Sequence, residues 1–153
     1  AAVERGLPVK FWATLVLWLC TSACAMAQAS ADLVLVTHQS SGISSVSASQ
    51  MRRAFMGLTV SVPQGPLRPI INESNESLRM AFLQHVVGLT EQMYQRRRLS
   101  LELQQGVTRP LAVRDQHQLV DRLRMLPTGV SFMWRSEAQR EPELRILRVI
   151  WAP

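Results

Sequence analysis

The amino-acid sequence predicts one α/β domain in which a sheet carries helices on both faces. Short apolar runs that are typical of buried strands alternate with segments whose apolar residues recur every three or four positions, as on one face of a helix. Alternation of this kind favours a sheet with helices packed against it. Residues 30–153, about 124 residues, suit a single domain that can bury an adequate core.

The first predicted strand and the first predicted helix lie close together in the sequence. The apolar run DLVLVT (32–37) predicts the strand, and the polar loop HQSSGISS follows it. Ser47 begins the helix, because Gln50 stands three positions later and completes a capping box. Gly57 suits the end of this helix, and VPQGP (62–66) predicts a turn.

The stretch INESNESLRMAFLQHVVG (71–88) leads from a second predicted strand, 67–71, into a helix that Gly88 ends. A junction of strand, polar turn and helix is a common anion site, because free backbone N–H groups and the helix dipole point at the turn. The same pattern also fits a helix that is only well capped. Both interpretations are open on this pattern alone.

Another helix, a strand and a further helix follow. Thr90 can cap the first of these helices, which runs to about Gln105 before Gly106 breaks it. RPLAV (109–113) predicts a third strand, and Asp115 can cap the next helix. The expected apolar contacts of the two helices are Met93, Tyr94, Leu101 and Leu103 for the first, and Leu119, Val120, Leu123 and Leu126 for the second.

Two strands complete the predicted sheet. PTG (127–129) stops the preceding helix, and VSFMW (130–134) predicts the fourth strand. A charged loop (135–143) then leads to LRILRVIW (144–151), the last strand.

Arginine supplies the positive charge of the predicted domain. The 17 basic and 11 acidic residues of the chain, less Arg5, Lys10 and Glu4, leave 15 Arg and 10 acidic residues, a net charge of +5. The arginines are spread along the chain and aromatic residues are not interleaved with them, so we expect no nucleic-acid partner. The run of three arginines, residues 96–98, is interpreted as a solvated helix face.

Residues 1–29 have the pattern of a secretory signal peptide. Basic residues precede an apolar stretch, Phe11 to Ala27, and small residues offer cleavage sites near its end. We therefore expect export to the periplasm and a mature domain of residues 30–153. The alternatives are a retained membrane helix of about 17 residues and a lipoprotein anchored at Cys24. Thr21 weakens the second, because a large aliphatic residue is expected three positions before the cysteine. Both cysteines, Cys20 and Cys24, lie in this segment, so the domain has no disulfide.

Two stretches, in the order and spacing of their marks, resemble the second lobe of phosphate-type periplasmic substrate-binding proteins. In VSASQMRRAFMGLTVSVPQGPLRPIINESNESLRMAFLQHVVG, Phe55 and Gly57 match the Phe-x-Gly that ends a helix, and Gly65 matches a turn glycine, whereas Val62 stands where the family has Trp. In QLVDRLRMLPTGVSFMW, a helix precedes a Pro-Gly strand entry in which Ser131 replaces a second Gly. The resemblance covers about residues 32–134 and implies a single-lobe periplasmic-binding-protein-like sheet. Full members of the family have two lobes.

The resemblance also implies where a phosphate would be held. The family grips it with Arg, three residues, then Ser-Gly-Thr at a helix start, where Arg pairs bidentately with the anion. These positions fall on Asn72, Glu76, Ser77 and Leu78, so none of the four residues is kept. Glu76 would repel an anion and already complements the helix dipole. We therefore expect a degenerate anion site and only weak binding of a small anion.

The candidate ligand-binding residues are small donors in three turns: Ser40, Ser41, Gly42, Ser74, Asn75, Ser77 and Thr128. A catalytic site is not expected, because His38, His85 and His117 are isolated and neither a nucleophile elbow nor a Walker loop occurs. No metal spacing is found and no cofactor is predicted.

The sequence thus favours a non-enzymatic, solute-binding-protein-like domain related to the substrate-binding proteins of phosphate ABC transporters. The alternative is a periplasmic interaction or sensor-input protein that binds a protein partner and no solute. We expect the loop 38–45 and the turns 72–77 and 127–129 to form one surface, because ligand sites of open α/β sheets lie at the carboxyl ends of strands. This surface is predicted to meet a membrane protein, another periplasmic protein or a second copy of the chain.

Overall fold

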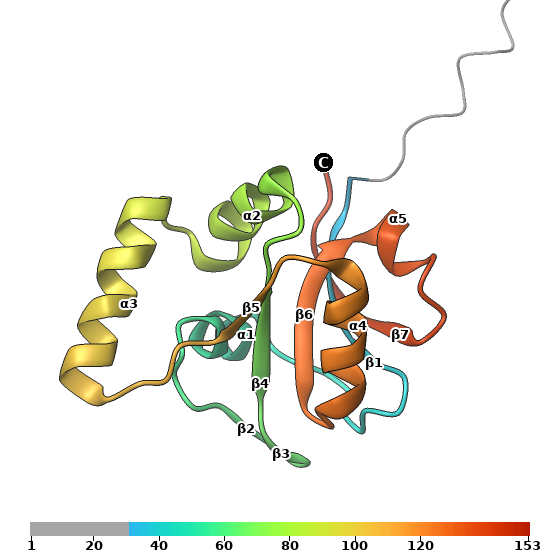
Figure 1. Cartoon of the computed structure of the whole chain (residues 1–153), viewed down its shortest axis with the longest axis horizontal. Helices are drawn as coiled ribbons and strands as arrows, with labels where there is room; N and C mark the ends of the chain where they lie inside the picture. The colour runs from blue at the N-terminus through green and yellow to red at the C-terminus, as the bar shows by residue number, and fades with distance from the viewer. Residues whose placement is uncertain (1–30) are drawn as a thin grey trace, which may run out of the picture.

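The computed structural model describes residues 31–153 and contains a five-stranded sheet in the order β5-β4-β6-β1-β7 (Figure 1). The predicted signal peptide lies outside the described residues. A small hairpin stands apart from the sheet. The elements are β1 (Leu33–His38), α1 (Ala48–Phe55), β2 (Ser61–Val62), β3 (Gly65–Pro66), β4 (Arg68–Asn72), α2 (Glu76–Phe82), a π-helical turn (Leu83–Val87), α3 (Glu91–Gln105), β5 (Leu111–Val113), α4 (Gln116–Met125), β6 (Gly129–Trp134), α5 (Arg135–Ala138) and β7 (Leu144–Trp151).

Strand direction divides the sheet into two parts. β4 pairs in parallel with β5 and β6, whereas β1 pairs antiparallel with β6 and with β7. Leu33, at the start of β1, therefore lies opposite both Trp134 of β6 and Trp151 of β7, at the ends of those strands. The end of β1 consequently lies at the opposite edge of the sheet from the ends of β4, β5 and β6.

Helices cover both faces of the sheet, as the sequence predicts. Successive residues of a strand point to opposite faces, so Leu33 and Leu35 join one core cluster while Val34 and Val36 join the other. The first cluster includes residues of α1, α2 and α3, and the second includes residues of α4 and α5. In Figure 1, α4 lies in front of the sheet and α1 behind it.

Three phenylalanines fill the centre of the first cluster. The rings of Phe82 and Phe132 stack with centroids 4.1 Å apart, and Phe55 meets both rings edge-on at 5.1 and 5.5 Å. Tyr94 of α3 packs edge-on against Phe82 and donates its hydroxyl to the backbone oxygen of Phe55. These contacts attach α1, α2 and α3 to β6. The edge-on and stacked arrangements are those that aromatic pairs prefer.

The helix caps form as the sequence predicts. Ser47 and Gln50 form the reciprocal capping box of α1, and Thr90 and Asp115 accept hydrogen bonds at the starts of α3 and α4. Gly106 ends α3 in the left-handed conformation that glycine adopts without a steric cost. The segment after α2 differs, because it continues as a π-helical turn up to Gly88.

The predicted loop 135–143 is wrong in part, because it begins with the short helix α5, whose first backbone N–H donates to the carbonyl of Asp32. Two predicted core contacts of α3 are also wrong: Met93 and Leu103 are 54% and 79% exposed. Along residues 31–153, no helix combines the length and apolar character that crossing a membrane requires.

Candidate functional site

The turn between β4 and α2 is held together by its own side chains. Asn72 is buried, and its side-chain amide donates to the backbone oxygen of Phe132 at 3.1 Å. Its side-chain oxygen accepts from the backbone N–H of Ser74 at 3.0 Å and from the Ser74 hydroxyl at 2.6 Å. Both donors of Ser74 are therefore used within the turn.

The start of α2 is capped in the same way. The side chain of Asn75 accepts from the backbone N–H of Leu78 at 3.3 Å, and this bond uses one of the free N–H groups of the first turn. Glu76 and Ser77 are exposed beside it. Within residues 31–153, Ser77 is the one candidate side chain of this turn without a hydrogen-bond partner.

A second group of candidate residues lies between the loop 38–45 and the turn before β6. The Ser41 hydroxyl donates to the Pro127 oxygen at 2.8 Å, and the Thr128 hydroxyl donates to the Pro66 oxygen at 2.7 Å. Arg145 of β7 donates to the carbonyl oxygens of Ser41 and Ile43, at 3.0 and 2.6 Å. Gly42 is exposed and lies against the side chain of Gln64. These contacts fix the loop in place.

The expectation that all three turns form one surface is wrong. Thr37, at the end of β1, donates its hydroxyl to the Gly129 oxygen at 2.7 Å, which places the loop 38–45 beside the start of β6. The turn 72–77 follows the end of β4, which runs parallel to β6. Ser40, Ser41, Gly42 and Thr128 therefore lie at one edge of the sheet, and Ser74, Asn75 and Ser77 lie at the other. The turn 127–129 lies opposite the turn 72–77 because it precedes a strand parallel to β4, and the loop 38–45 lies with it because β1 runs antiparallel, a direction that an apolar run does not reveal.

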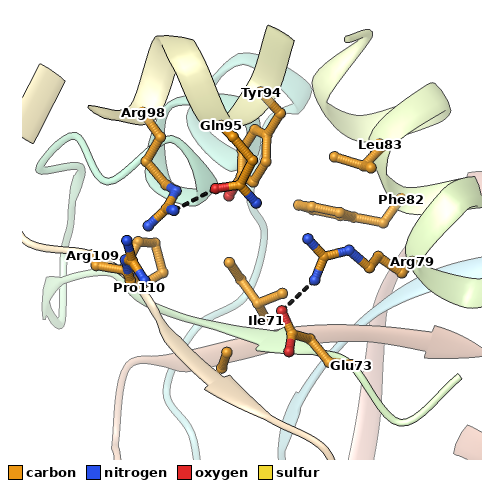
Figure 2. A pocket seen from close by; sticks show the side chains of 11 residues that line it. Ile71, Glu73, Arg79, Phe82, Leu83, Tyr94, Gln95, Arg98, Arg109 and Pro110 are labelled. Carbon is orange, nitrogen blue, oxygen red and sulfur yellow. Dashed lines mark hydrogen bonds and ion pairs between the residues drawn. The ribbon is translucent and has the colours of Figure 1, made fainter. Parts of the chain in front are cut away.

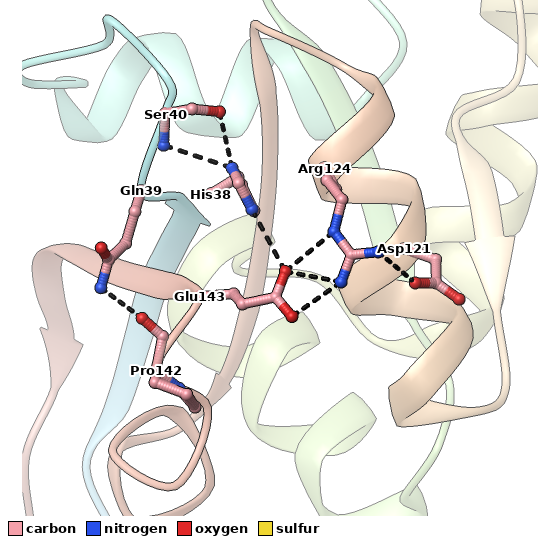
Figure 3. A network of polar contacts seen from close by, with 7 residues as sticks. All are labelled: His38, Gln39, Ser40, Asp121, Arg124, Pro142 and Glu143. Carbon is pink, nitrogen blue, oxygen red and sulfur yellow. Dashed lines mark hydrogen bonds and ion pairs between the residues drawn. The ribbon is translucent and has the colours of Figure 1, made fainter.

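Figure 3 shows an ionic network at the edge that carries the loop 38–45. Arg124 of α4 binds Glu143 through three contacts of 2.6–2.8 Å and binds Asp121 at 3.2 Å. The hydrogen bond from Arg124 lowers the pKa of the Glu143 carboxyl, and a bond from His38 adds to this effect. The network links α4 to the segment before β7 and to the end of β1.

Ser40, His38 and Glu143 stand in a row within this network, in the order of a hydrolase triad. Nδ1 of His38 lies 2.7 Å from the Ser40 hydroxyl, and Nε2 lies 3.4 Å from the Glu143 carboxylate. The carboxylate is closer to Arg124, which already neutralises it, and the three residues line none of the cavities described below. The row therefore supplies no argument for nucleophilic catalysis.

A cavity of about 220 Å³ lies between β4, α2, α3 and the segment before β5 (Figure 2). Three arginines line it, but each is paired. Arg79 binds Glu73 and Glu91, Arg98 donates to Gln95 at 2.5 Å and to Glu102 at 3.1 Å, and the exposed Arg109 lies 3.4 Å from Glu102. The hydrogen bond from Arg79 lowers the pKa of Glu91. With three glutamates for three arginines, the cavity offers a small anion little excess charge.

Arg98 corrects the interpretation of residues 96–98 as a solvated helix face. Arg96 and Arg97 are exposed, whereas Arg98 is 8% exposed and lies over the ring of Tyr94 at 6.0 Å. The helical spacing of Tyr94, Arg98 and Leu101, all buried, is the signal that could have found it.

An open groove of about 770 Å³ runs beside the turn 72–77, and the sequence reasoning missed it. Trp134 ends β6 and Trp151 ends β7, and the ring of Trp151 stacks on His85 with centroids 4.5 Å apart. Met80 of α2, 56% exposed, lies on the other wall. The available signal was a tryptophan at the end of each of two predicted strands. We call Asn75, Ser77, Met80, Trp134 and Trp151 the strand-end surface.

Residues 31–153 contain no group of three or more His, Cys, Asp or Glu that could hold a metal ion. The turn 72–77, the arginine cavity and the groove offer polar, cationic and aromatic contacts for binding.

Comparison with solved structures identifies the fold. The chain is similar to an ABC-type phosphate transport receptor from Vibrio cholerae, with a TM-score of 0.56 and 13% identity, over 78% of this chain and 47% of that one. It is also similar to PstS from Borrelia burgdorferi, with a TM-score of 0.55 and 13% identity, over 77% of this chain and 47% of that one. No protein-family model and no curated protein matches the chain.

These similarities confirm the predicted fold class. The chain is a mixed α/β domain with a five-stranded sheet like that of the phosphate receptors, and it spans about half of their length, 47% in each comparison. At 13% identity the similarity concerns the fold.

Proposed function

We propose that the protein is an exported, non-enzymatic binding domain that uses one lobe of a phosphate-receptor-like fold to contact a protein partner. The contact is made by the strand-end surface, and phosphate is not held there. The observation that carries this proposal is the turn between β4 and α2, in which Asn72 and Asn75 use the polar groups that a phosphate would need.

The charge of the turn supports the same proposal. Glu76 stands exposed in the first turn of α2, where a carboxylate interacts favourably with the helix dipole and repels an anion. Asn72 occupies the position at which the resemblance implies the gripping arginine. A site that has lost its cation and gained an anion has little affinity for phosphate.

The groove beside the turn supplies what a protein interface needs. Trp134 and Trp151 are partly buried and both line the groove, so part of each side chain is fixed in the fold and part is exposed. Tryptophan and methionine are enriched at interfaces, and Trp supplies large contact area with few rotatable bonds. The groove is open along its length, whereas a small-ligand pocket encloses most of its ligand.

Export to the periplasm rests on the pattern of residues 1–29 and gives the partner a location, in the periplasm or on the membrane that bounds it. We take the mature protein to begin between Gln28 and Asp32. The intact mass of the protein recovered from the periplasm tests this proposal, because a mass that retains Cys24 with added acyl chains would instead identify a lipoprotein.

A photo-crosslinking amino acid at Ser77 tests the contact in living cells. Ser44 is the matched control, because it is an exposed serine on the loop 38–45 at the opposite edge of the sheet. We expect a discrete crosslinked adduct from position 77 and none from position 44. Equal crosslinking at both positions, or none at position 77, would overturn the proposal.

A weak anion site in the cavity of Figure 2 is the second candidate, and the convergence of Arg79, Arg98 and Arg109 favours it. Arg109 is the most exposed of the three and has the longest ion pair, 3.4 Å, so it is the side chain that a ligand could recruit. Calorimetry with phosphate, comparing the wild type with Arg109→Ala and with the exposed Arg122→Ala as control, tests it. Binding that only Arg109→Ala abolishes would favour this candidate.

A further inference from the structure

Helix α3 presents an outward face without a negative charge. Its buried residues are Tyr94, Arg98 and Leu101. Both of its glutamates are paired with arginines, Glu91 with Arg79 and Glu102 with Arg98. In Figure 1, α3 stands at the left edge of the molecule, away from the sheet.

Four arginines surround a groove of about 740 Å³ between α1 and α3. Within residues 31–153 none of the four forms an ion pair, and no acidic residue lines the groove. Its apolar lining includes Met56 and Leu101, both buried. The four, Arg52, Arg53, Arg96 and Arg97, are all exposed.

Large apolar side chains project from the same helix. Met93, Leu99 and Leu103 are 54%, 53% and 79% exposed, and they make up three of the seven exposed large hydrophobic residues within 31–153. The spacing of Arg96, Leu99 and Leu103 places these residues on one side of the helix. Exposed apolar and basic residues side by side are typical of a surface that binds an anionic membrane.

We propose that this surface, defined by Arg52, Arg53, Arg96, Arg97, Met93, Leu99 and Leu103 and called the arginine face, binds anionic membrane lipid. The guanidinium groups contact lipid phosphates, because Arg pairs bidentately with phosphate, and the apolar side chains enter the boundary between headgroups and acyl chains. The four arginines, which form no ion pair within residues 31–153, give this face a positive charge that is complementary to the negative surface of such a membrane.

An acidic peptide is the competing occupant of the groove, and the positions of two leucines argue against it. Leu99 and Leu103 are exposed but do not line the groove, so a peptide that filled the groove would leave both in water. A membrane surface contacts the groove rim and the outer side of α3 together. The arginine face is distinct from the strand-end surface, and the inference does not depend on the proposed protein partner.

Sedimentation with lipid vesicles tests the arginine face. The exported protein is mixed with vesicles of phosphatidylglycerol and phosphatidylcholine, or of phosphatidylcholine alone, at about 0.1 M and about 1 M salt. The test variant carries Gln in place of Arg52, Arg53, Arg96 and Arg97. The control variant carries Gln in place of four exposed arginines elsewhere, Arg68, Arg114, Arg122 and Arg140, so that both lose the same net charge. All proteins have the same N-terminus, so residues 1–30 contribute equally.

We expect wild-type binding to the anionic vesicles only, and binding that weakens at high salt. The test variant should bind at least about tenfold more weakly, and the control variant within about twofold of the wild type. Leu99→Ser should weaken binding about threefold, whereas Met125→Ser, a change at another exposed apolar residue, should not.

Absence of wild-type binding, or equal losses in the two arginine variants, would overturn the proposal. Unchanged binding by Leu99→Ser would overturn it in favour of a purely electrostatic contact that no apolar side chain of α3 enters. Binding of soluble glycerol phosphate as tight as that of vesicles would overturn it in favour of a free anion. Equal thermal midpoints of the proteins are the check that each variant is folded.

Discussion

The side-chain amide of Asn72 donates a hydrogen bond to the backbone oxygen of Phe132, across the pair of strands β4 and β6. Asn72 stands at the position where the resemblance to phosphate-binding proteins implies an arginine. The buried side chain of Asn72 therefore links β4 to β6. It could contact a ligand only by giving up the hydrogen bonds that hold the turn.

Replacement of Asn72 by alanine is expected to destabilise the fold. The change leaves the oxygen of the buried Phe132 without the Asn72 amide, and a buried group that loses its partner costs about 1–3 kcal/mol. The exposed Ser74 also loses the acceptor of its hydroxyl. Ser77→Ala is the matched control in the same turn, because Ser77 is exposed. Urea denaturation measures both. Equal free energies of unfolding for Asn72→Ala and the wild type would contradict the role assigned to this side chain.

Phosphate is expected to bind weakly or not at all near neutral pH. The gripping Arg, Ser, Gly and Thr are replaced by Asn72, Glu76, Ser77 and Leu78, and the turn is hydrogen-bonded internally. Isothermal calorimetry of the wild type with phosphate is the measurement. A dissociation constant of about 1 μM, equivalent to about −8 kcal/mol, would show that the turn or the arginine cavity is a competent site.

Local signals in the sequence predict most of the elements, because those signals act over a few residues. The apolar runs place β1, β4, β6 and β7, and the capping side chains Ser47, Thr90 and Asp115 place three helix starts. A capping side chain bonds a backbone N–H only two or three residues away, so the neighbouring sequence determines where the helix starts.

The candidate site is predicted less well, because it depends on strand order and direction. The pairing of β1 with β6 joins residues about a hundred positions apart, and an apolar run reads the same for either direction. The prediction that the loop 38–45 shares a surface with the turn 72–77 is therefore wrong. Three consecutive arginines predict a charged surface, but Arg98 is buried together with Tyr94 and Leu101, which lie on the same side of the helix.

Gly57→Ala is expected to lower the free energy of unfolding by about 2–4 kcal/mol. Gly57 has a φ of 90°, and an added Cβ would lie 2.6 Å from Cγ1 of Val107 and 3.0 Å from the Thr108 oxygen. The change thus combines a left-handed conformation with overpacking. Gly106→Ala is the control, because Gly106 has a φ of 62° and open space around it, so it should cost only about 1–2 kcal/mol. Equal losses would show that the contact with Val107 is unimportant.

Arg79→Met is expected to reduce stability at neutral pH and to have less effect in acid. The bond from Arg79 lowers the pKa of Glu91 below its ordinary value of 4.5. A carboxylate with a lowered pKa stabilises the fold above its unfolded pKa, and this contribution is lost as the pH falls through the folded value. The stability difference from the wild type should therefore shrink below about pH 4.5.

The loss from Arg79→Met should be no more than about 1 kcal/mol at neutral pH, because the Glu91 side chain is 43% exposed and solvent screens the pair. Arg122→Met, at an exposed arginine without an ion pair within residues 31–153, should show no such pH dependence. Urea denaturation at a series of pH values measures both variants. A difference that stays constant down to strongly acid pH would mean that Arg79 acts through packing alone.

The last prediction concerns two serines that the sequence places on one surface and the structure places at opposite edges of the sheet. Ser77 is exposed at the start of α2, so Ser77→Arg should leave the thermal midpoint nearly unchanged. If the strand-end surface meets a protein partner, this large cation beside Trp134 and Trp151 should abolish crosslinking from a probe placed at Met80.

Ser41 is 6% exposed and its hydroxyl binds the Pro127 oxygen, so Ser41→Arg should lower the thermal midpoint because the guanidinium has no room. Ser44→Arg, two residues beyond Gly42 in the same loop and exposed, should change neither property. Thermal denaturation measures the midpoints, and the crosslinking yield measures contact with the partner. A partner that is lost with Ser44→Arg and retained with Ser77→Arg would place the interaction at the opposite edge, on the loop 38–45.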